Sequence, residues 1–427
     1  LQGTVLFVAS AGTECSKGSV IITLESMKMQ HDISADADGA VSEVLVQVGQ
    51  AVKTGDRLIS FSPRKISLDS LIEVSPEVEA LVRPDLDEVQ RRHQVGLDNE
   101  RKKAVAKRHG QGRLTARENI SLLIDEGSLV EYGPTVVAAQ RRRRSLDDLI
   151  TKTPADGLVG GLASINGSLF SGHDSRVVVM SYDYAVLAGT QGQQNHRKKD
   201  RLFDVAEKLQ LPVVFFAEGG GGRPGDTDGL GVSGLDCWAF HDFAKLSGLV
   251  PLIGITGGFC FAGNAAILGC CDVVIALEGS NIGMGGPAMI EGGGLGVFAP
   301  QEIGPLSVQQ ANGVVDLVAR DDAHAVDLAK KYLSYFQGPV CNFNIHDQDQ
   351  LRTAIPINRV KAYDVRNVIE LMFDVDSVLE LRSGFGLGMI TALARVQGRP
   401  VGVIANNPHH LSGAIDSDGA DKAARFM

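Results

Sequence analysis

The sequence has no apolar run long enough to cross a bilayer and no excess of positive charge. Its apolar runs, such as 177–180 and 213–217, are short and are bounded by polar residues or glycines. A transmembrane helix needs about 20 apolar residues in succession, so we expect these runs to be buried strands and expect no membrane partner. The net charge of -10 over 427 residues argues against a nucleic-acid partner.

Paired cysteines and metal-binding motifs are also absent. The six cysteines form no Cys-x-x-Cys pair and mostly lie in apolar segments, which is typical of reduced, buried thiols in an intracellular protein. The ten histidines include no His-Glu-x-x-His pattern, so we expect no metal site. We expect a cytoplasmic location, and the start at Leu1 leaves any targeting segment open.

The length and the apolar content of 44% allow a large core but exceed one ordinary domain. Residues 1–62 are rich in strand-forming residues and turn glycines, whereas strands alternate with helices from Asp156 onward. Between these patterns, Pro63, Pro76 and Pro84 are interleaved with charges. We therefore expect a mixed fold in which a small all-β domain over 1–62 is joined by a linker over 63–88 to a layered α/β part.

The segment Met27-Lys28-Met29 lies at the centre of an internal repeat. Gly3-Thr4-Val5 matches Gly39-Ala40-Val41, and the two halves superpose at an offset of 36 to 37 residues. Each half alternates apolar and polar residues, which predicts two short sheets packed face to face with Lys28 on a tight hairpin between them. An exposed amine flanked by apolar, adaptable side chains is what a covalently attached prosthetic group needs.

Residues 1–62 resemble the biotinyl carrier domain of biotin-dependent carboxylases, a flattened barrel or sandwich in which Ala-Met-Lys-Met or Ser-Met-Lys-Met surrounds the biotinylated lysine. The resemblance implies biotin attached to Lys28, with Met27 and Met29 beside it. Lipoyl domains share the architecture but typically lack the methionines, so biotin is preferred over lipoate. For an isolated motif the alternative is an ordinary solvated lysine, and the repeat argues against it.

Three glycine-rich stretches accompany predicted strands of the α/β part. The first contains Gly219, Gly220, Gly221 and Gly222, the second contains Cys260-Phe261-Ala262-Gly263-Asn264, and the third contains Gly285 and Gly286. Glycine lets peptide N–H groups approach a ligand closely, and the ends of strands are where α/β sheets bind ligands. Each stretch alone is compatible with a surface loop, whereas together they predict a pocket whose backbone amides stabilise an enolate oxygen.

Residues from about 89 to 427 resemble the carboxyltransferase of acyl-CoA carboxylases, a crotonase-like (ClpP/crotonase) fold of paired N and C domains. In that family the first oxyanion-hole motif is often Cys-Ala-Gly-Gly-Ala, and 260–264 is the equivalent stretch here. The amide donors carry over as Ala262, Gly263 and Asn264, but the first glycine is replaced, so which two donate stays open. The implied N domain spans 89–345, and 346–427 is the first part of a C domain whose own oxyanion amides lie beyond Met427.

Two further patterns concern the α/β part. Residues 125–131 compare with 374–380, and 158–167 with 388–398, which indicates an internal duplication. Arg197, Lys198 and Lys199 at the start of a predicted helix are candidates for contacts with coenzyme A phosphates, and a solvated helical face is the alternative. For the four arginines at 141–144 the alternatives are a solvated loop and a phosphate contact.

A carrier followed directly by a carboxyltransferase resembles the second half of single-chain, multi-domain bacterial acyl-CoA carboxylases. This implies transfer of carbon dioxide from carboxybiotin on Lys28 to the α carbon of an acyl-CoA, through an enolate held by backbone amides. It also implies a biotin carboxylase domain or subunit that uses ATP, magnesium and bicarbonate, and nothing in this sequence resembles its ATP-binding domain. A biotin protein ligase and a homo-oligomer, hexameric in the family with active sites between subunits, are implied as well.

Three other functions remain as alternatives. The same transfer run in reverse defines a biotin-dependent acyl-CoA decarboxylase subunit. A crotonase-class hydratase or isomerase needs positioned carboxylates and leaves Lys28 unexplained. A non-catalytic biotinylated scaffold leaves the glycine-rich stretches unexplained. The length of the acyl chain stays open.

Overall fold

The computed structural model describes residues 2–64, 83–229 and 237–427. The chain divides into two compact units, Leu1–Pro84 and Asp85–Met427, which we describe separately. Within the described residues, no helix combines the length and apolar character needed to pass through a bilayer.

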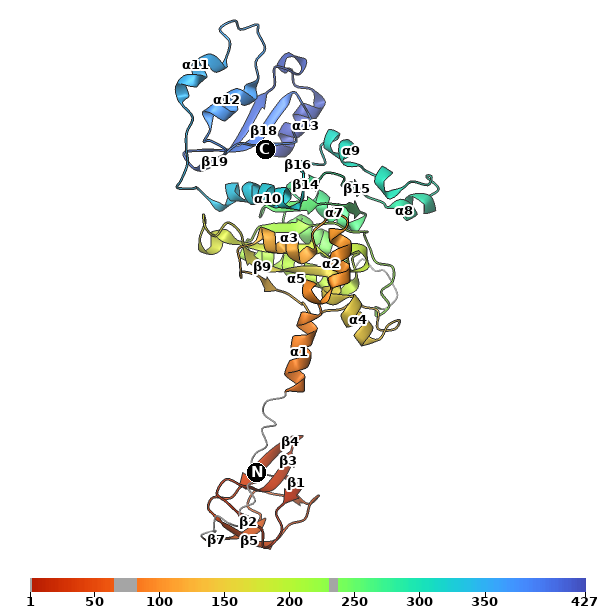
Figure 1. The fold of residues 1–427 in the computed structure, drawn as a ribbon, viewed down its shortest axis with the longest axis vertical. Coiled ribbons are helices and arrows are strands. Elements are labelled where there is room, and N and C mark those ends of the chain that lie inside the picture. The colour runs from red at the N-terminus through yellow and green to blue at the C-terminus, as the bar shows by residue number, and fades with distance from the viewer. Residues whose placement is uncertain (1, 65–82, 230–236) are drawn as a thin grey trace. The chain divides into compact units, whose positions relative to one another are not determined.

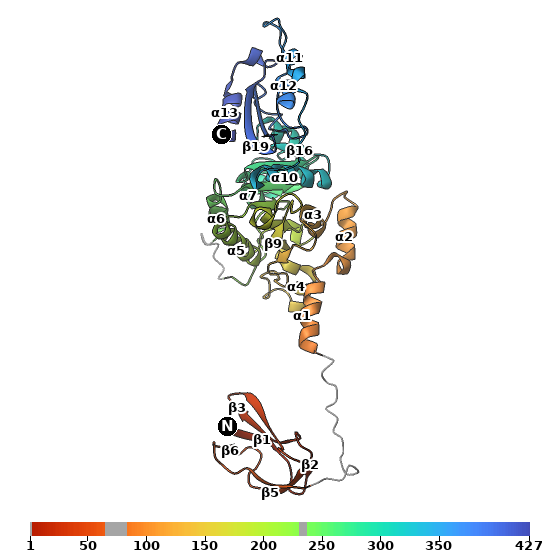
Figure 2. The same ribbon diagram turned by 90° about the vertical axis from the view of Figure 1, so that its left-hand side faces the viewer.

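The first unit consists of two small antiparallel sheets. One sheet has the strand order β4-β3-β1-β6, and the other has the order β2-β5-β7 (Figure 1 and Figure 2). The strands are β1 (Gly3–Val8), β2 (Glu14–Cys15), β3 (Val20–Ser26), β4 (Met29–Ser34), β5 (Gly39–Val44), β6 (Ala51–Val52) and β7 (Ile59–Pro63). The unit has apolar clusters of its own, one around Val5 and Leu24 and one around Ile21 and Val41. The predicted pair of short sheets is confirmed.

The internal repeat of the first unit is visible in matched backbone contacts. The N–H of Gly12 donates to the carbonyl of Val41, and the N–H of Gly49 donates to the carbonyl of Val5, each at 2.7 Å. Both glycines are left-handed, with φ of 89° and 88°, a conformation that favours glycine. Each half of the repeat therefore contributes an equivalent glycine turn that hydrogen-bonds to the other half.

The second unit begins with short helices rather than one long one. They are α1 (Pro84–Gln94), α2 (Lys102–His109), α3 (Ala116–Leu123) and α4 (Leu146–Lys152). Helix-forming residues fill the segment 89–117, but they do not form one continuous helix because the segment is interrupted. Gly112 turns the chain at a φ of 69°, and α3 starts afresh with a capping box in which Thr115 Oγ1 accepts from the N–H of Glu118 at 3.1 Å.

A seven-stranded sheet forms the centre of the second unit, in the order β16-β14-β12-β11-β10-β9-β8. Its strands are β8 (Val130–Glu131), β9 (Leu158–Ser164), β10 (Arg176–Tyr182), β11 (Val213–Phe216), β12 (Leu252–Thr256), β14 (Val273–Leu277) and β16 (Leu317–Ala319). Of these strands, β10, β11, β12, β14 and β16 run parallel to one another. Strand β9 pairs antiparallel with β10, and β8 pairs antiparallel with β9.

Helices cover both faces of this sheet because its strands are apolar on both sides. Along β10, Val177 and Val179 belong to the cluster that contains α3 and α10 (Asp322–Gln337). Met180 and Tyr182 belong to the opposite cluster, with α5 (Gln193–Leu209) and α6 (Ala239–Lys245). Figure 2 shows α5 and α6 on one side of the sheet and α3 on the other. The predicted α/β layering is confirmed.

A smaller parallel pair of strands, β13 (Phe259–Phe261) and β15 (Asn281–Gly283), lies beside the ends of the central strands. In the sequence, α7 (Gly263–Gly269) follows β13, and α8 (Pro287–Gly292) and α9 (Leu306–Ala311) follow β15. The C-terminal part contains α11 (Leu351–Ala354), α12 (Val365–Met372), α13 (Ser417–Phe426) and a sheet of β17 (Leu379–Leu381), β18 (Met389–Val396) and β19 (Arg399–Asn406). Helix α10 contacts both the central and the C-terminal sheet (Figure 1).

The C-terminal sheet repeats the first strands of the central sheet. Both β8-β9-β10 and β17-β18-β19 are antiparallel. Their flanking ion pairs correspond, since Arg117 pairs with Glu131 at 3.0 Å and Arg366 with Glu380 at 2.7 Å. The predicted internal duplication is therefore confirmed.

Candidate active site

The two-residue turn at Met27 and Lys28 joins β3 to β4, with Ser26 opposite Met29. Both turn residues are left-handed, with φ of 52° and 66°, as a tight type I′ hairpin requires. Lys28 is exposed, and Met27 and Met29 expose 94% and 64% of their surface. The Lys28 amine forms no hydrogen bond or ion pair with any described residue. This lysine fits covalent attachment of a prosthetic group.

The structure brings the three glycine-rich stretches of the second unit together. Gly219 and Cys260 form a parallel bridge, and Phe261 is opposite Gly283 in the β13–β15 pair. A Cβ placed on Gly286 would lie 3.6 Å from the Phe261 ring. Gly285 and Gly286 lead into α8, of which Gly286 is the N-cap residue. The three stretches therefore border one region, as the sequence suggested.

Most amides of the 219–222 stretch are already paired inside the protein. The N–H of Gly219 donates to Phe259 O at 2.8 Å, that of Gly220 to Ala188 O at 3.1 Å, and that of Gly221 to Asn264 Oδ1 at 3.0 Å. Glycine is required here because the stretch is packed against Asn264 and Ala262. A Cβ on Gly219 would lie 2.2 Å from Asn264 Nδ2, and one on Gly221 would lie 2.7 Å from Ala262 Cβ.

The three expected oxyanion donors differ in their backbone pairing. The N–H of Ala262 donates to Gly283 O at 2.9 Å. Helix α7 begins at Gly263, and the N–H groups of Gly263 and Asn264 have no acceptor among the described residues. Gly263 is partly exposed. Of the three amides, those of Gly263 and Asn264 are therefore unpaired, with Gly263 partly exposed and Asn264 buried.

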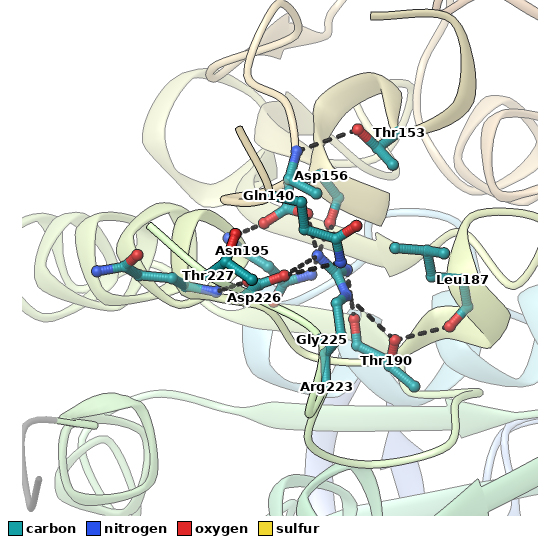
Figure 3. A network of polar contacts seen from close by, with 12 residues as sticks. Gln140, Thr153, Asp156, Leu187, Thr190, Asn195, Arg223, Gly225, Asp226 and Thr227 are labelled. Atoms are coloured by element: carbon teal, nitrogen blue, oxygen red, sulfur yellow. Dashed lines mark hydrogen bonds and ion pairs between the residues drawn. The ribbon is translucent and has the colours of Figure 1, made fainter. Parts of the chain in front are cut away.

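A buried polar network holds the chain immediately after the glycine stretch (Figure 3). Arg223, whose side chain is nearly inaccessible, pairs with the fully buried Asp156 and donates to Thr190 O at 2.8 Å. Asp226 accepts from the N–H of Gln193 at 2.8 Å. Burial raises the pKa of Asp156, against the opposing effect of Arg223. The sequence showed Arg223 and Asp226 only as a loop after glycines, because their partners are distant in the chain.

The carboxylate of Glu218, next to Gly219, is also engaged. Arg108 donates to both of its oxygens, at 3.0 and 2.7 Å. Among the described residues, the carboxylates closest in sequence to the glycine stretch, Glu218 and Asp226, are thus held by arginine or backbone contacts. Neither is placed as an unengaged general base.

The expected phosphate contacts on α5 require a correction. Lys198 and Lys199 expose only 7% and 0% of their surface. Lys198 Nζ donates to the carbonyls of Ala155 and Leu158, and Lys199 Nζ donates to Tyr182 and Gln191. Both lysines lie on the face of the amphipathic helix that packs on the sheet, so they cannot reach a phosphate at the surface. Arg197 is exposed.

The arginine-rich segment borders a pocket of about 530 Å³. Its lining includes Arg92, Arg141, Arg142 and Gln194. Arg143 donates to Gly225 O at 3.0 Å, and Arg144 pairs with Asp148 at 3.0 Å. The side chains of Arg141 and Arg142 are exposed and make no hydrogen bond or ion pair with described residues. The pocket therefore presents two unengaged cations.

Family comparisons agree with this architecture. The family described as carboxyl transferase domain matches residues 107–427, and the family described as biotin-requiring enzyme matches residues 2–61. The chain belongs to the carboxyl transferase family and carries a biotin-requiring domain at its N-terminal end.

Individual relatives are similar over most of the chain. The methylmalonyl-CoA carboxyltransferase 12S subunit of Propionibacterium freudenreichii subsp. shermanii is 33% identical over 337 residues, 76% of this chain and 61% of that protein. A solved structure of a single-chain, multi-domain long-chain acyl-CoA carboxylase is 55% identical, with a TM-score of 0.79, and the match covers 100% of this chain and 41% of that one. A transcarboxylase 12S structure is 31% identical, with a TM-score of 0.69, over 80% of this chain and 67% of that one.

These comparisons confirm the expected fold, a biotinyl all-β domain followed by a crotonase-like carboxyltransferase part, and the expected combination of a biotin-requiring domain with a carboxyl transferase domain. The chain spans 61% of the curated relative's length. The domain boundaries at 62/63, 88/89 and 345/346 stay predictions. Most of the expected linker, 65–82, lies outside the described residues, and α1 crosses the position 88/89.

Proposed function

We propose that this chain performs the carboxyltransferase step of a biotin-dependent acyl-CoA carboxylase. The observation that carries the proposal is the pair of unpaired amides at Gly263 and Asn264, next to a glycine stretch whose own amides are mostly satisfied. Loss of the α proton of an acyl thioester places negative charge on the thioester oxygen. Two fixed N–H donors stabilise that charge without any side-chain reorganisation.

In this proposal Lys28 holds biotin by an amide bond, and Met27 and Met29 provide apolar surface beside it. When bound, biotin supplies the carboxyl group that forms the new carbon–carbon bond at the α carbon and takes up the proton released there. The chain contributes positioning and fixed dipoles. The engagement of Glu218 by Arg108 and of Asp226 by Gln193 disfavours a hydratase or isomerase that depends on a free carboxylate.

The same proposal assigns coenzyme A to the pocket that includes Arg141 and Arg142. Guanidinium groups bind phosphate well because they offer several donors in one plane. Gln194 lines this pocket and lies one helical turn before the exposed Arg197, which adds a third cation. We propose Arg141, Arg142 and Arg197 as phosphate contacts, in place of Lys198 and Lys199.

The proposed partners follow from the chemistry and from the relatives. A biotin carboxylase domain or subunit, using ATP, magnesium and bicarbonate, would load the carrier, and a biotin protein ligase would modify Lys28. The transcarboxylase 12S relative assembles as a hexamer, and we propose a homo-oligomer of that kind. The six cysteines are free thiols, which supports a cytoplasmic location.

The test is incubation of the full-length protein with labelled bicarbonate, ATP, a biotin carboxylase and a panel of acyl-CoAs from acetyl to long-chain. We expect acid-stable label in at least one acyl-CoA. A Lys28→Arg variant serves as the control, because it keeps the charge but lacks the amine that is modified. Acid-stable label in none of the products would overturn the proposal.

A further inference from the structure

A lysine lies buried beneath the proposed oxyanion site without a negative partner. Lys199 on α5 is fully buried, and its Nζ donates to Tyr182 Oη at 2.9 Å and to Gln191 Oε1 at 2.5 Å. The amine also lies 5.3 Å from the centre of the Tyr182 ring. No ion pair of Lys199 occurs within the described part of the chain. Burying such a group costs free energy, so its contacts need an explanation.

The residue that accepts from Lys199 reaches both glycine-rich stretches. Gln191 Nε2 donates to Asn264 Oδ1 at 3.0 Å. In the backbone, the N–H of Gln191 donates to Gly221 O at 2.8 Å, and the carbonyl of Gln191 accepts from the N–H of Arg223 at 2.9 Å. Gln191 therefore connects the 219–222 stretch to Asn264, the last residue of the 260–264 stretch.

The side chain of Asn264, in α7, hydrogen-bonds to Gln191 and to two backbone groups. Its Oδ1 accepts from the N–H of Gly221 as well as from Gln191, each at 3.0 Å, and its Nδ2 donates to Gly189 O at 3.2 Å. Asn264 also carries one of the two unpaired backbone amides. The side chain thus anchors the same residue whose N–H faces the substrate in our proposal.

Lys199 and the backbone together set the direction of these hydrogen bonds. A side-chain amide can turn by 180°, which exchanges its oxygen and its NH₂ group. For Asn264 the N–H of Gly221 and the carbonyl of Gly189 fix the orientation, with the oxygen toward Gln191. For Gln191, Lys199 Nζ donates to Oε1, which keeps the oxygen on that side and Nε2 toward Asn264. Lys199 therefore holds Gln191 in the orientation in which it donates to Asn264.

We propose that Lys199 is a positioning residue for carboxyl transfer, which through Gln191 and Asn264 holds Gly221 and the free amides of Gly263 and Asn264 in the geometry that receives the thioester oxygen. The inference rests on the proposed function of those amides. It predicts that loss of Lys199 impairs the transition state more than the binding of acyl-CoA, because the phosphate contacts lie elsewhere.

Lys199→Met in the full-length protein tests the inference, with Lys198→Met as the matched control. Lys198 is also a buried lysine of α5, but it donates only to the carbonyls of Ala155 and Leu158. We expect kcat for carboxyl transfer to fall at least tenfold in Lys199→Met, with KM for the acyl-CoA within twofold. Lys198→Met should lower the unfolding temperature but keep kcat within twofold.

Gln191→Glu separates positioning from stability. The new carboxylate would pair with Lys199 and preserve that buried contact, but it has no N–H to donate to Asn264 Oδ1. We expect a folded protein with an unfolding temperature at or above that of the wild type and a kcat at least tenfold lower. In the double variant Lys199→Met/Gln191→Glu, kcat should be no lower than in Gln191→Glu alone. The inference would be overturned if the loss of kcat in the double variant were the product of the losses in the two single variants. It would also be overturned if kcat were unchanged in Lys199→Met or in Gln191→Glu.

Amide hydrogen exchange tests the positioning role of Lys199 independently of catalytic turnover. In Lys199→Met we expect faster amide exchange in peptides covering 217–224 and 259–266, and no such change in Lys198→Met. A wild-type protein that transfers no carboxyl group would overturn the proposed function, while exchange would still report whether Lys199 orders these two segments. Equal exchange in Lys199→Met and wild type would overturn the positioning role.

Discussion

At the scale of single residues, strained backbone gathers around the candidate site. Ala155, Asp156, Leu187, Ala188 and Ala262 are non-glycine residues with φ between 48° and 56°. The carbonyl of Ala188 accepts from the N–H of Gly220, and Asp156 pairs with Arg223, so these two residues support the glycine stretch and the chain after it. Positive φ values of this kind cost about 1–3 kcal/mol each and persist where the surroundings enforce them.

Ala262 occupies a position at which the resembling family often has glycine. Its φ of 50° and ψ of -121° suit glycine far better than alanine. We expect Ala262→Gly to raise the free energy of unfolding by about 1 kcal/mol, as measured by urea denaturation. Ala265→Gly, within α7, is the control and should lower stability by about 0.5–1 kcal/mol. Equal destabilisation by both changes would contradict strain at Ala262.

The titration of Lys199 gives a second prediction at this scale. Burial lowers its pKa to about 7 from the usual 10.5, so between these pH values the unfolded chain binds more protons than the native one. The free energy of unfolding therefore rises with pH over this window. The titratable groups near Lys199 are Tyr182 of β10, Asp156 before β9, His196 and Asp200 of α5, and Cys237 before α6.

Lys199→Met removes this contribution. We expect the difference in unfolding free energy, wild type minus variant, to grow as pH rises from about 7 to about 10. Urea denaturation at several pH values measures it, with Lys245→Met, a half-exposed lysine, as the control. A difference independent of pH would show that Lys199 titrates normally.

At the scale of elements, the sequence predicted what apolar periodicity encodes. The runs 177–180 and 213–217, expected to be buried strands, fall on β10 and β11 because each is a continuous apolar run buried on both faces. The short edge strands β8 and β16 were not predicted. The separate helices α1, α2 and α3 were not distinguished, because helix-forming residues fill the segment and Gly112 gives only a local signal. The inward lysines of α5 were missed for a related reason, since residue type alone places lysine on the solvent side.

The sequence predicted which stretches form the candidate site, but it did not predict which of their amides are hydrogen-bonded within the protein. Glycine-rich stretches after strands indicated a backbone-lined pocket, and the structure brings them together. Which amides are free depends on contacts between distant segments, such as Ala262 with Gly283 and Gly221 with Asn264. No local pattern encodes these contacts. The same is true of the Asp156–Arg223 pair, whose members lie in different loops.

The Asp156–Arg223 pair gives a prediction for the connection between these loops. Arg223→Met leaves the fully buried carboxylate of Asp156 without its partner, and we expect a loss of about 3–5 kcal/mol in unfolding free energy at pH 7. Burial already raises the pKa of Asp156, and losing the arginine raises it further. The variant's native state therefore takes up a proton as pH falls, and the loss should shrink between pH 7 and 5.

Arg201→Met is the control for this series, because the Arg201–Asp204 pair lies at the surface. We expect it to change stability within the error of a urea titration at every pH. A loss for Arg223→Met that grows on acidification would contradict the assignment of Asp156 as a buried anion.

At the scale of the whole molecule, two units with separate cores share one chain. A tether raises the local concentration of one partner near the other, up to about millimolar. We expect a protein lacking residues 1–64 to keep the fold of its α/β unit but to lose carboxyl transfer. Biotinylated 1–64 added at 10 µM should restore a rate about 100-fold below that of the intact chain, in line with this ratio of concentrations.

The carrier with Lys28→Arg, added at the same concentration, is the control and should restore nothing. A rate equal to that of the intact chain at 10 µM added carrier would show that the tether contributes no effective concentration. Steady-state transfer to an acyl-CoA measures all three cases.

A single-turnover chase tests the central claim most directly. The full-length protein is loaded with a labelled carboxyl group, freed of bicarbonate and ATP, and mixed with an acyl-CoA that it uses. We predict that label leaves the protein and appears in the carboxylated acyl-CoA, and that the Lys28→Arg protein takes up no label at the start. Label that stays on the protein, or is released as carbon dioxide at the same rate with and without acyl-CoA, would contradict the account.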